Sequence, residues 1–538
     1  MTRGEPSFAP INEADDAIAC AASVPTAETT SRSSATAPAL STSANTAKPV
    51  KKPAPRARKA QSQQVQPIEP HHNGVVKSSR QAHALIARLR DEASERARPL
   101  VKAGSAPIRV MARMVADLEA TCREQGIPDE LIASEVVNRT IGDVDLRKVS
   151  PNDDGPEFVS LADDMGLALP GEVIGGRRAT GKTYRWLRET MLDFERQLLA
   201  RRWDVRMYDI AGTGNPLLRE MLAEYAHEHW GSPLPPAQIY LSLGALDGLD
   251  KFFRAFSFMR QAAGHAQTAV IFPAPSFNVP EWQARSLGLR LHRLYTQPED
   301  HFKVTPEMLR TALAEHEDIA AFYLTVSNNP TAFAYTPDEL RALFAVVTQA
   351  DRDVTIVADL AYIGTGIPED DRARMAAFLA PEVLPHSVFV SSFSKTHSLT
   401  GDRCGWVGFG DPALATAAGV GWTNTTAALP ADWQLRYMAN IRLFREHPEL
   451  EERVRALYAH RRKRLVQQLA HLNKRHGLFV QVNLDDGGTV YNWSQLRPDA
   501  DVFTLFGETG IAGVPGSGFG YSDDFVRLSV GCIPVPAV

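Results

Sequence analysis

The 538-residue chain has few cysteines, no strong charge and no long apolar run. Its four cysteines are far apart and none has metal-ligand spacing, so neither a disulfide framework nor a cysteine metal site is indicated. The formal net charge is −5, which gives the molecule no electrostatic reason to bind nucleic acid. No apolar run approaches the roughly 20 residues of a membrane helix, and no secretory signal pattern is present. These deficits predict a cytoplasmic protein without a nucleic-acid or membrane partner.

The composition changes near residue 79. Residues 1–78 are rich in Ala, Ser, Thr, Pro and Gln and nearly lack aromatics, which predicts a disordered tail. Residues 48–59 carry six positive charges, a pattern that favours a solvated linker over a weak contact with nucleic acid or acidic lipid. Residues 79–152 are predicted to form a helical prelude with no repeat and no catalytic cluster. Apolar residues have helical spacing at 80–97, 108–124 and 128–138.

Two further regions follow, at 153–430 with an N-terminal arm and at 431–538. In the first, short β-type runs alternate with helical stretches, which predicts a mostly parallel sheet with helices on both faces. The β-type runs are Ile239–Leu243, Thr268–Phe272, Ala320–Val326, Thr355–Ala358 and Ser387–Ser391. In the second, long helical stretches precede short strand-like pieces, which predicts a smaller α+β domain. The fold class is therefore α/β.

A different polar group follows each predicted strand. A small-residue turn, Gly244–Gly248, comes first, then Asn329, then Asp359 with Tyr362, then a stretch from Ser392 to Lys395 with Arg403 beyond it. Ligands bind at the carboxyl ends of such strands. This set matches the needs of pyridoxal 5'-phosphate (PLP). The phosphate needs N–H, Ser and Arg donors, the pyridine nitrogen needs a carboxylate, the ring oxygen needs Asn and Tyr donors, and the aldehyde needs a lysine for a Schiff base.

The motifs, in their order and approximate spacing, resemble those of the class I/II aminotransferases of fold type I over roughly residues 155–535. They are Ser392-Phe393-Ser394-Lys395 with Arg403, Asp359-x-x-Tyr362, Asn329-Pro330-Thr331, and Pro515–Gly520 followed by Arg527-Leu528-Ser529. The resemblance implies a PLP-dependent transfer of an amino group between an amino acid and a 2-keto acid. It also implies a homodimer whose active sites are built from two chains.

The resemblance further implies a role for each matched residue. Lys395 is expected to be the Schiff-base lysine and proton shuttle, Asp359 the pyridinium partner, and Tyr362 a further catalytic residue. The other implied contacts are Ser392, Arg403 and the backbone N–H groups of Ala245 and Leu246 to the phosphate, Tyr362 and Asn329 to the ring oxygen, Phe277 stacked on the ring, Asn329 and Arg527 on the substrate, and Tyr208 from the neighbouring chain to the phosphate.

Three features depart from the family pattern. Position 332 is alanine where the family usually has glycine, and Tyr208 is one residue out of register with the tyrosine lent across the dimer. The sequence stops at Val538, eleven residues after Arg527, where the family continues into a terminal helix. Three explanations stay open: a truncated sequence, prelude helices in the place of that helix, or impaired activity.

Three other functions are compatible with parts of the sequence. Gly176–Thr183 fits the P-loop pattern G-x-x-x-x-G-K-T, but Glu172-Val173-Ile174 is a poor candidate for the buried strand that a P-loop follows. A PLP-dependent decarboxylase or a C–S or β-lyase would share the cofactor loops. A regulator that fuses a winged helix to an aminotransferase-like domain is the third alternative, although residues 79–150 show no clear wing or recognition helix.

Overall fold

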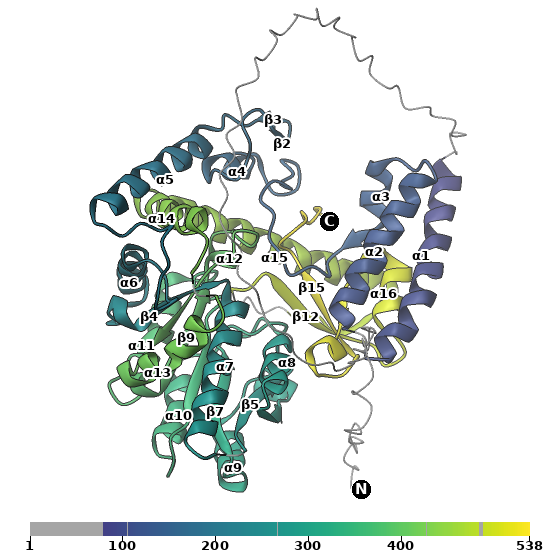
Figure 1. Cartoon of the computed structure of the whole chain (residues 1–538). Coiled ribbons are helices and arrows are strands. Elements are labelled where there is room, and N and C mark those ends of the chain that lie inside the picture. The colour runs from purple at the N-terminus through teal and green to yellow at the C-terminus, as the bar shows by residue number, and fades with distance from the viewer. Residues whose placement is uncertain (1–78, 105, 266, 427, 484–487) are drawn as a thin grey trace, which may run out of the picture. The chain divides into compact units, whose positions relative to one another are not determined.

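A computed structural model of the chain describes residues 79–104, 106–265, 267–426, 428–483 and 488–538 (Figure 1). All of them fall within one unit of the chain, Val76–Val538. The predicted tail, residues 1–78 with the basic run at 48–59, lies outside the described residues.

A seven-stranded sheet forms the centre of the larger region. Its strands, in spatial order, are β4 (Ile239–Leu243), β10 (Cys404–Phe409), β9 (Ser387–Ser392), β8 (Thr355–Asp359), β7 (Ile319–Thr325), β5 (Ala269–Ala274) and β6 (Arg290–Tyr295). β10 is antiparallel to both of its neighbours, and every other pair is parallel. The predicted, mostly parallel sheet is therefore confirmed.

Helices cover both faces of this sheet, because both faces of its strands are apolar. Along β5, Val270 and Phe272 join one hydrophobic cluster, whereas Ala269 and Ile271 join the other. The first cluster contains α7 (Ala245–Ala262), α8 (Val279–Ser286) and α13 (Pro412–Thr423). The second contains α6 (Pro216–Trp230), α9 (Pro306–Glu315), α10 (Pro337–Thr348) and α11 (Pro368–Phe378). Successive side chains of a strand point to opposite faces, so a sheet buried on both sides needs this apolar sequence.

The C-terminal region is the smaller α+β part that the sequence predicts. Two long helices come first, α14 (Ala431–Glu446) and α15 (Glu449–His476). A four-stranded antiparallel sheet follows, and α16 (Val502–Thr509) lies between two of its strands in sequence. In spatial order the strands are β11 (Phe479–Gln481), β12 (Tyr491–Leu496), β15 (Phe525–Ser529) and β14 (Val514–Pro515).

The N-terminal helices pack against this C-terminal region. They are α1 (Ser79–Lys102), α2 (Pro107–Glu124) and α3 (Asp129–Glu135), close to the predicted positions. α1 packs on α16, α2 packs on β14, and β1 (Val137–Asn138) pairs in parallel with β13 (Ile511–Ala512). Figure 1 shows these purple helices beside the yellow C-terminal elements. Packing of the prelude on the smaller region agrees with one of the three explanations above, in which the prelude helices take the place of the family's terminal helix.

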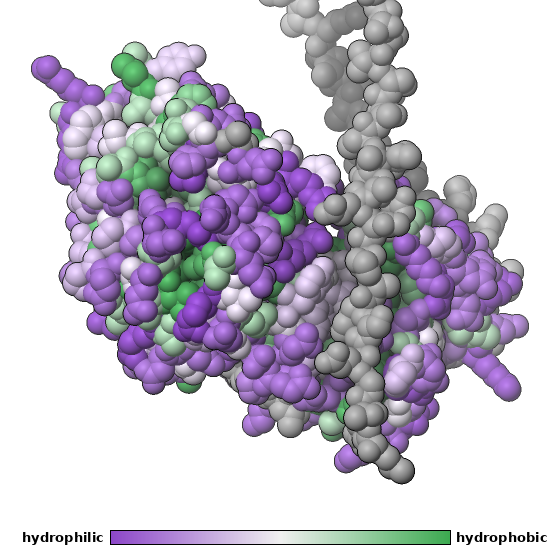
Figure 2. All heavy atoms as spheres, turned by 90° about the horizontal axis from the view of Figure 1, so that it is seen from below, coloured by the Kyte–Doolittle hydropathy of each residue, from purple (hydrophilic) through white to green (hydrophobic). Residues whose placement is uncertain are grey.

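The surface is chiefly polar on the face drawn in Figure 2, where apolar side chains gather only in small separate groups. Within the described part of the chain, no helix is both long enough and apolar enough to cross a bilayer.

Candidate active site

The register of the large sheet brings the predicted polar positions to one edge. Asp359 ends β8 and pairs with Thr325 at the end of β7. Ser392 ends β9 and pairs with Gly405, and the neighbouring residue of β10 pairs with Leu243 at the end of β4. Adjacent strands lie about 4.8 Å apart, so these side chains follow one another along the carboxyl edge.

Arg403 lies at the part of this edge where β4 leads into α7. Its guanidinium donates to the carbonyl oxygen of Leu243 at 3.2 Å and to that of Thr400 at 2.9 Å. Gly244, which precedes α7, has φ +82°, and a Cβ there would lie 2.3 Å from Arg403 Nη2. The positive φ favours glycine at this position, and without a Cβ the guanidinium can lie directly against the turn.

Backbone N–H donors at the start of α7 lie beside the cationic Arg403. The N–H groups of Ala245 and Leu246 lie in the first helical turn, where helix geometry provides no backbone acceptor. Ser392, on the adjacent strand end, is buried. An arginine, a hydroxyl and a helix N-terminus at one edge favour a bound anion such as a phosphate group.

Asp359 is a buried carboxylate without a cationic partner. It accepts hydrogen bonds from the Tyr323 hydroxyl at 2.7 Å and from the Ala361 N–H at 3.0 Å. Burial raises the pKa of Asp359, and these two hydrogen bonds offset only part of that shift. Within the described residues it forms no ion pair, so a protonated ring nitrogen would supply the missing positive charge.

Arg527, in β15, is a buried cation without an anionic partner among the described residues. Its Nη1 donates to Asn329 Oδ1 at 3.0 Å and its Nη2 to the carbonyl oxygen of Thr140 at 2.7 Å. Its guanidinium carbon lies 4.5 Å from the ring centroid of Tyr491 and 4.8 Å from that of Phe519. Arg527 is buried, its Nε makes no hydrogen bond, and none of the described acidic residues pairs with it. A buried cation in this state is suited to a ligand carboxylate.

Lys395 lies on the short helix α12 (Phe393–Thr396) that follows β9. Its Nζ donates to the carbonyl oxygen of Gly142. The Tyr491 hydroxyl donates to the same oxygen at 3.4 Å, and the Tyr362 hydroxyl donates to that of Tyr491 at 2.8 Å. One polar chain therefore joins Lys395 to Tyr362 and, through Tyr491, to the guanidinium of Arg527.

A buried polar network connects the α12 backbone to α15. The Tyr458 hydroxyl donates to the carbonyl oxygen of Lys395 at 2.8 Å. His397 Nε2 lies 2.8 Å from Glu451 Oε1, and His397 Nδ1 lies 2.6 Å from the hydroxyl of Thr396. Burial lowers the pKa of the His397 imidazole. A neutral His397 that donates from Nε2 to an ionised Glu451 satisfies both contacts.

Two predicted residues are not drawn into this group. Tyr208 is 83% exposed. Phe277 is half-buried between β5 and α8, and its ring forms no aromatic pair within the described chain. Lys395, Tyr362, Asn329 and Arg527 share contacts, whereas Asp359, Ser392, Arg403 and the start of α7 are placed along the edge by strand register. The individual roles of all these residues stay predictions.

Sequence reasoning missed four residues of this group. Thr140 and Gly142 lie in the prelude, where no catalytic cluster was expected, and Tyr323 and Tyr491 lie within strands. Gly142 lies so close to the site that a Cβ there would be 2.3 Å from the Tyr491 hydroxyl, a contact that only the structure reveals. The sequence offers one weak signal, a tyrosine inside an otherwise apolar strand, as at position 323. That signal does not identify the partner of the hydroxyl.

The alanine at position 332 occupies a conformation that favours glycine. Ala332 has φ +64° and is buried, and its N–H donates to the carbonyl oxygen of Asn328 at 2.9 Å. The left-handed region costs a non-glycine residue roughly 1–2 kcal/mol. The turn that positions Asn329 is therefore retained here with some backbone strain.

The P-loop pattern at 176–183 lies in a different structural context from a working P-loop. Among the described residues, its preceding strand, β2 (Val173–Ile174), pairs only with the equally short β3 (Arg177–Arg178), outside the seven-stranded sheet. The Asp163 carboxylate accepts hydrogen bonds from the N–H groups of Thr180 and Gly181 at 2.7 and 2.9 Å. These contacts use amides that would otherwise face a phosphate.

Comparisons with known proteins agree with this geometry. Residues 209–534 match the family model of class I and II aminotransferases. The chain is 27% identical over 322 residues to an aspartate aminotransferase of Bacillus subtilis, covering 58% of this chain and 76% of the relative. It is 26% identical over 336 residues to an asparagine–oxo-acid transaminase of Streptococcus mutans, covering 60% and 78%.

Solved structures share the fold. The aspartate aminotransferase from Thermus thermophilus with maleate aligns with a TM-score of 0.55 at 21% identity, covering 78% of this chain and 92% of that one. The aspartate aminotransferase from Rhizobium meliloti aligns with a TM-score of 0.56 at 18% identity, covering 78% and 90%.

Proposed function

Because the chain belongs to the class I and II aminotransferases, a PLP-dependent family, we propose that the carboxyl edge of its large sheet is the active site and that Lys395 holds the cofactor. The enzyme moves an amino group between an amino acid and a 2-keto acid. One observation carries the assignment to this edge: a buried cation, Arg527, and a buried anion, Asp359, both lack a charged partner among the described residues. A zwitterionic substrate and a protonated cofactor ring together supply those partners.

The donor set fits the cofactor at each of its polar groups. When bound, PLP supplies an aldehyde carbon for an amine and a protonated ring that accepts the electron pair of the substrate α-carbon. Asp359 would hold the ring nitrogen, and Arg403, Ser392 and the amides that begin α7 would hold the phosphate. Asn329 uses its oxygen for Arg527, and this leaves its Nδ2 amide to donate toward the ring oxygen beside Tyr362.

Lys395 would act first as the amine that binds the aldehyde carbon and then as the base. When it is not holding the cofactor, the free Nζ would be the base that takes up and returns the proton of the substrate α-carbon. Its observed acceptor, the Gly142 carbonyl oxygen, orients the amine toward the Tyr491–Tyr362 pair. Phe277 would cover one face of the ring.

Arg527 would bind the substrate α-carboxylate. Its planar fork is held by Asn329 and Thr140 and lies over two aromatic rings, so little side-chain entropy is lost when the carboxylate binds. The Nε group, which makes no hydrogen bond among the described residues, provides a donor for that ligand.

The test is product analysis of the PLP-loaded protein with a panel of amino acids and 2-keto acids. We expect paired formation of a new keto acid and a new amino acid. Arg527→Gln should raise the KM for the amino acid by about tenfold or more, because a buried charge-assisted pair is lost. Arg310→Gln, an exposed arginine paired with Glu307, is the matched control and should leave KM unchanged. Carbon dioxide, ammonia or thiol as the product would instead support the decarboxylase or lyase alternatives.

We propose further that the enzyme is a homodimer in which Tyr208 contributes to the neighbouring site. Met207, Tyr208 and Ile210 are 69%, 83% and 89% exposed on the segment that precedes α6. Three large apolar side chains exposed within four residues fit a surface that a second chain covers. Sedimentation tests the dimer, and mixing of Lys395→Ala with Tyr208→Phe protein tests the shared site. Mixed dimers should regain part of the activity; a fully active monomer would contradict the architecture.

Two remaining expectations also belong to this proposal. The winged-helix regulator is disfavoured, since the helices and strands in the described part of 79–150 are α1–α3 and the two-residue strand β1. A cytoplasmic location rests on the sparse cysteines, of which the three that the structure describes, Cys122, Cys404 and Cys532, are free thiols. Cell fractionation would test it.

A further inference from the structure

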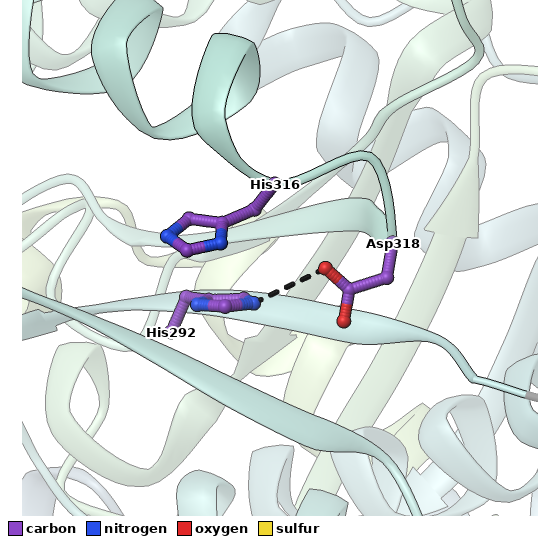
Figure 3. A group of neighbouring side chains, drawn as sticks. All are labelled: His292, His316 and Asp318. Atoms are coloured by element: carbon purple, nitrogen blue, oxygen red, sulfur yellow. Dashed lines mark hydrogen bonds and ion pairs between the residues drawn. The ribbon is translucent and has the colours of Figure 1, made fainter.

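Three metal-binding side chains meet at the opposite edge of the large sheet from the active site. His292 is the third residue of the edge strand β6, His316 follows the last residue of α9, and Asp318 precedes β7. Their ligand atoms all lie within 4.8 Å of one another. Because β6 and β7 enter the sheet here, the group lies at the amino ends of the parallel strands. Figure 3 shows the two imidazole rings one above the other, with the carboxylate beside His292.

The spacing of the ligand atoms is close to that of a coordination shell. His292 Nε2 lies 3.3 Å from Asp318 Oδ1, and the two imidazole rings are stacked with centroids 4.1 Å apart. Tetrahedral zinc with bonds of about 2.0–2.1 Å separates its ligand atoms by roughly 3.3–3.4 Å. The first pair already has this separation, and a rotation of the partly exposed His316 ring brings in the third atom.

The backbone positions of two of these ligands are fixed before any ion arrives. The carbonyl oxygen of Asp318 accepts the N–H of Ala269 at 2.8 Å, and that of His316 accepts a hydrogen bond from Arg352 at 2.9 Å. The His316 ring itself makes no hydrogen bond within the described chain. Asp318 Oδ2 is buried and likewise accepts none there, although Arg290 lies 3.1 Å from it as an ion pair. Two donor atoms are therefore available to an ion.

We propose that His292, His316 and Asp318 form a transition-metal site, with zinc as the cation that its donor set fits best. Two imidazole nitrogens and one carboxylate oxygen are borderline ligands that favour zinc and its neighbours over magnesium or calcium. Three protein ligands leave the fourth position to water. The ion would join edge strand β6 to the turn between α9 and β7, so its effect is on the stability of this edge and not on the transfer reaction.

Arg290 sets the affinity of this site. Its side chain is 55% exposed and donates to Gln267 Oε1 at 2.9 Å while it pairs with Asp318. A cation must compete with this guanidinium for the carboxylate. Removal of the positive charge should therefore tighten metal binding, whereas removal of a ligand should weaken it.

The experiment uses the tag-free PLP-loaded enzyme and titrates zinc against a chromophoric chelator, with cobalt absorption as a report of geometry. We expect one ion per chain, and an affinity at least tenfold lower in His292→Gln, His316→Ala and Asp318→Asn. Arg290→Gln should bind at least threefold more tightly. His447→Gln removes an exposed histidine that pairs with Glu449, and it is the matched control with unchanged affinity.

A second measurement separates this proposal from a role in catalysis or folding. Saturating zinc should raise the Tm of the wild type and of His447→Gln, but not that of His316→Ala, while turnover stays within twofold in all three. Equal affinity in the wild type and the three ligand variants would overturn the proposal. So would a zinc-dependent rise in Tm that persists in His316→Ala.

Discussion

The two ends of the large parallel sheet hold polar groups of opposite character. At the carboxyl end, Asp359 and Arg527 are buried, are held by hydrogen bonds, and have no charged partner among the described residues. At the amino end, the Asp318 carboxylate is paired with Arg290, and His316 is partly exposed. Charge that is buried and uncompensated costs several kcal/mol unless a ligand supplies the opposite charge. The first end is therefore organised for an obligatory ligand, whereas the second is stable without one.

The largest effect that separates the two ends is expected from Lys395→Ala. In the proposed site, loss of the amine would remove both the covalent attachment and the base, so turnover should fall by at least about a thousandfold. Borohydride reduction of the wild type followed by peptide mapping should place the cofactor on Lys395. Lys182→Ala, in the P-loop-like segment, is the control and should keep normal turnover. Cofactor trapped on a different lysine would show that the site is misassigned.

Asp359→Ala should give the next largest effect. In the proposed site the carboxylate would keep the ring nitrogen protonated, so its loss should reduce turnover by about a hundredfold or more while cofactor binding stays measurable. Absorbance titration with PLP measures binding, and steady-state rates measure turnover. His316→Ala, at the other end of the sheet, provides the contrast and should turn over normally. A near-normal rate in Asp359→Ala would erase the functional difference between the two ends.

The histidine network behind Lys395 should make the stability of the carboxyl end depend on pH. Burial lowers the pKa of His397, so the unfolded chain binds a proton at this imidazole more readily than the folded chain does. This contribution is present above pH about 6.5 and is lost as pH falls from there toward the folded value. Burial alone would raise the pKa of Glu451, but His397 and His229 lower it by more, so the pKa of the folded protein is lowered. The stability that this carboxylate contributes is therefore present above pH about 4.3 and is lost as the pH falls below it.

His229 acts in the opposite direction. Burial alone would lower its pKa, but the hydrogen bond and charge of Glu451 outweigh it and the pKa is raised. Its contribution is therefore present below pH about 6.5 and is lost as pH rises through the folded value. Tm should fall less steeply between pH 6.5 and 5 in His397→Gln than in the wild type. His447→Gln should follow the wild type, and an identical slope in all three proteins would exclude His397 as the source.

The smallest effect is expected at the turn that positions Asn329. Ala332→Gly relieves the left-handed strain but adds freedom to the unfolded chain, so the net gain should be about 0.5–1 kcal/mol. For a chain of this size that is a rise in Tm of about 1 °C. Ala314→Gly, in the ordinary helix α9, should lower Tm by a similar amount. A destabilised Ala332→Gly would mean that the backbone strain is already relieved by its surroundings.

The sequence allowed the large sheet and its strand-end groups to be predicted because both depend on local pattern. Apolar runs such as Thr355–Ala358 fix a strand, and the strand places the residue after it, Asp359, at the carboxyl edge. Contacts between distant segments follow no such pattern. The approach of Gly142 to Lys395, and of Thr140 to Arg527, depends on how the N-terminal arm crosses the C-terminal region. The amino-end cluster was missed because its three residues belong to three separate elements.

The packing of α1 and α2 on the C-terminal region also affects the order of events during synthesis. In this arrangement Arg98 of α1 pairs with Asp501 and lies 4.7 Å from the ring centroid of Phe503. The ribosome has 377 residues to add between the end of α2 and the start of α16. At 5–20 residues per second, that takes roughly 20–75 s. The two helices can pack on each other early. The surface that they present to α16 and β14 stays uncovered until those elements have been synthesised. During that interval the side chains of α1 and α2 that later pack on α16 and β14 are exposed to solvent.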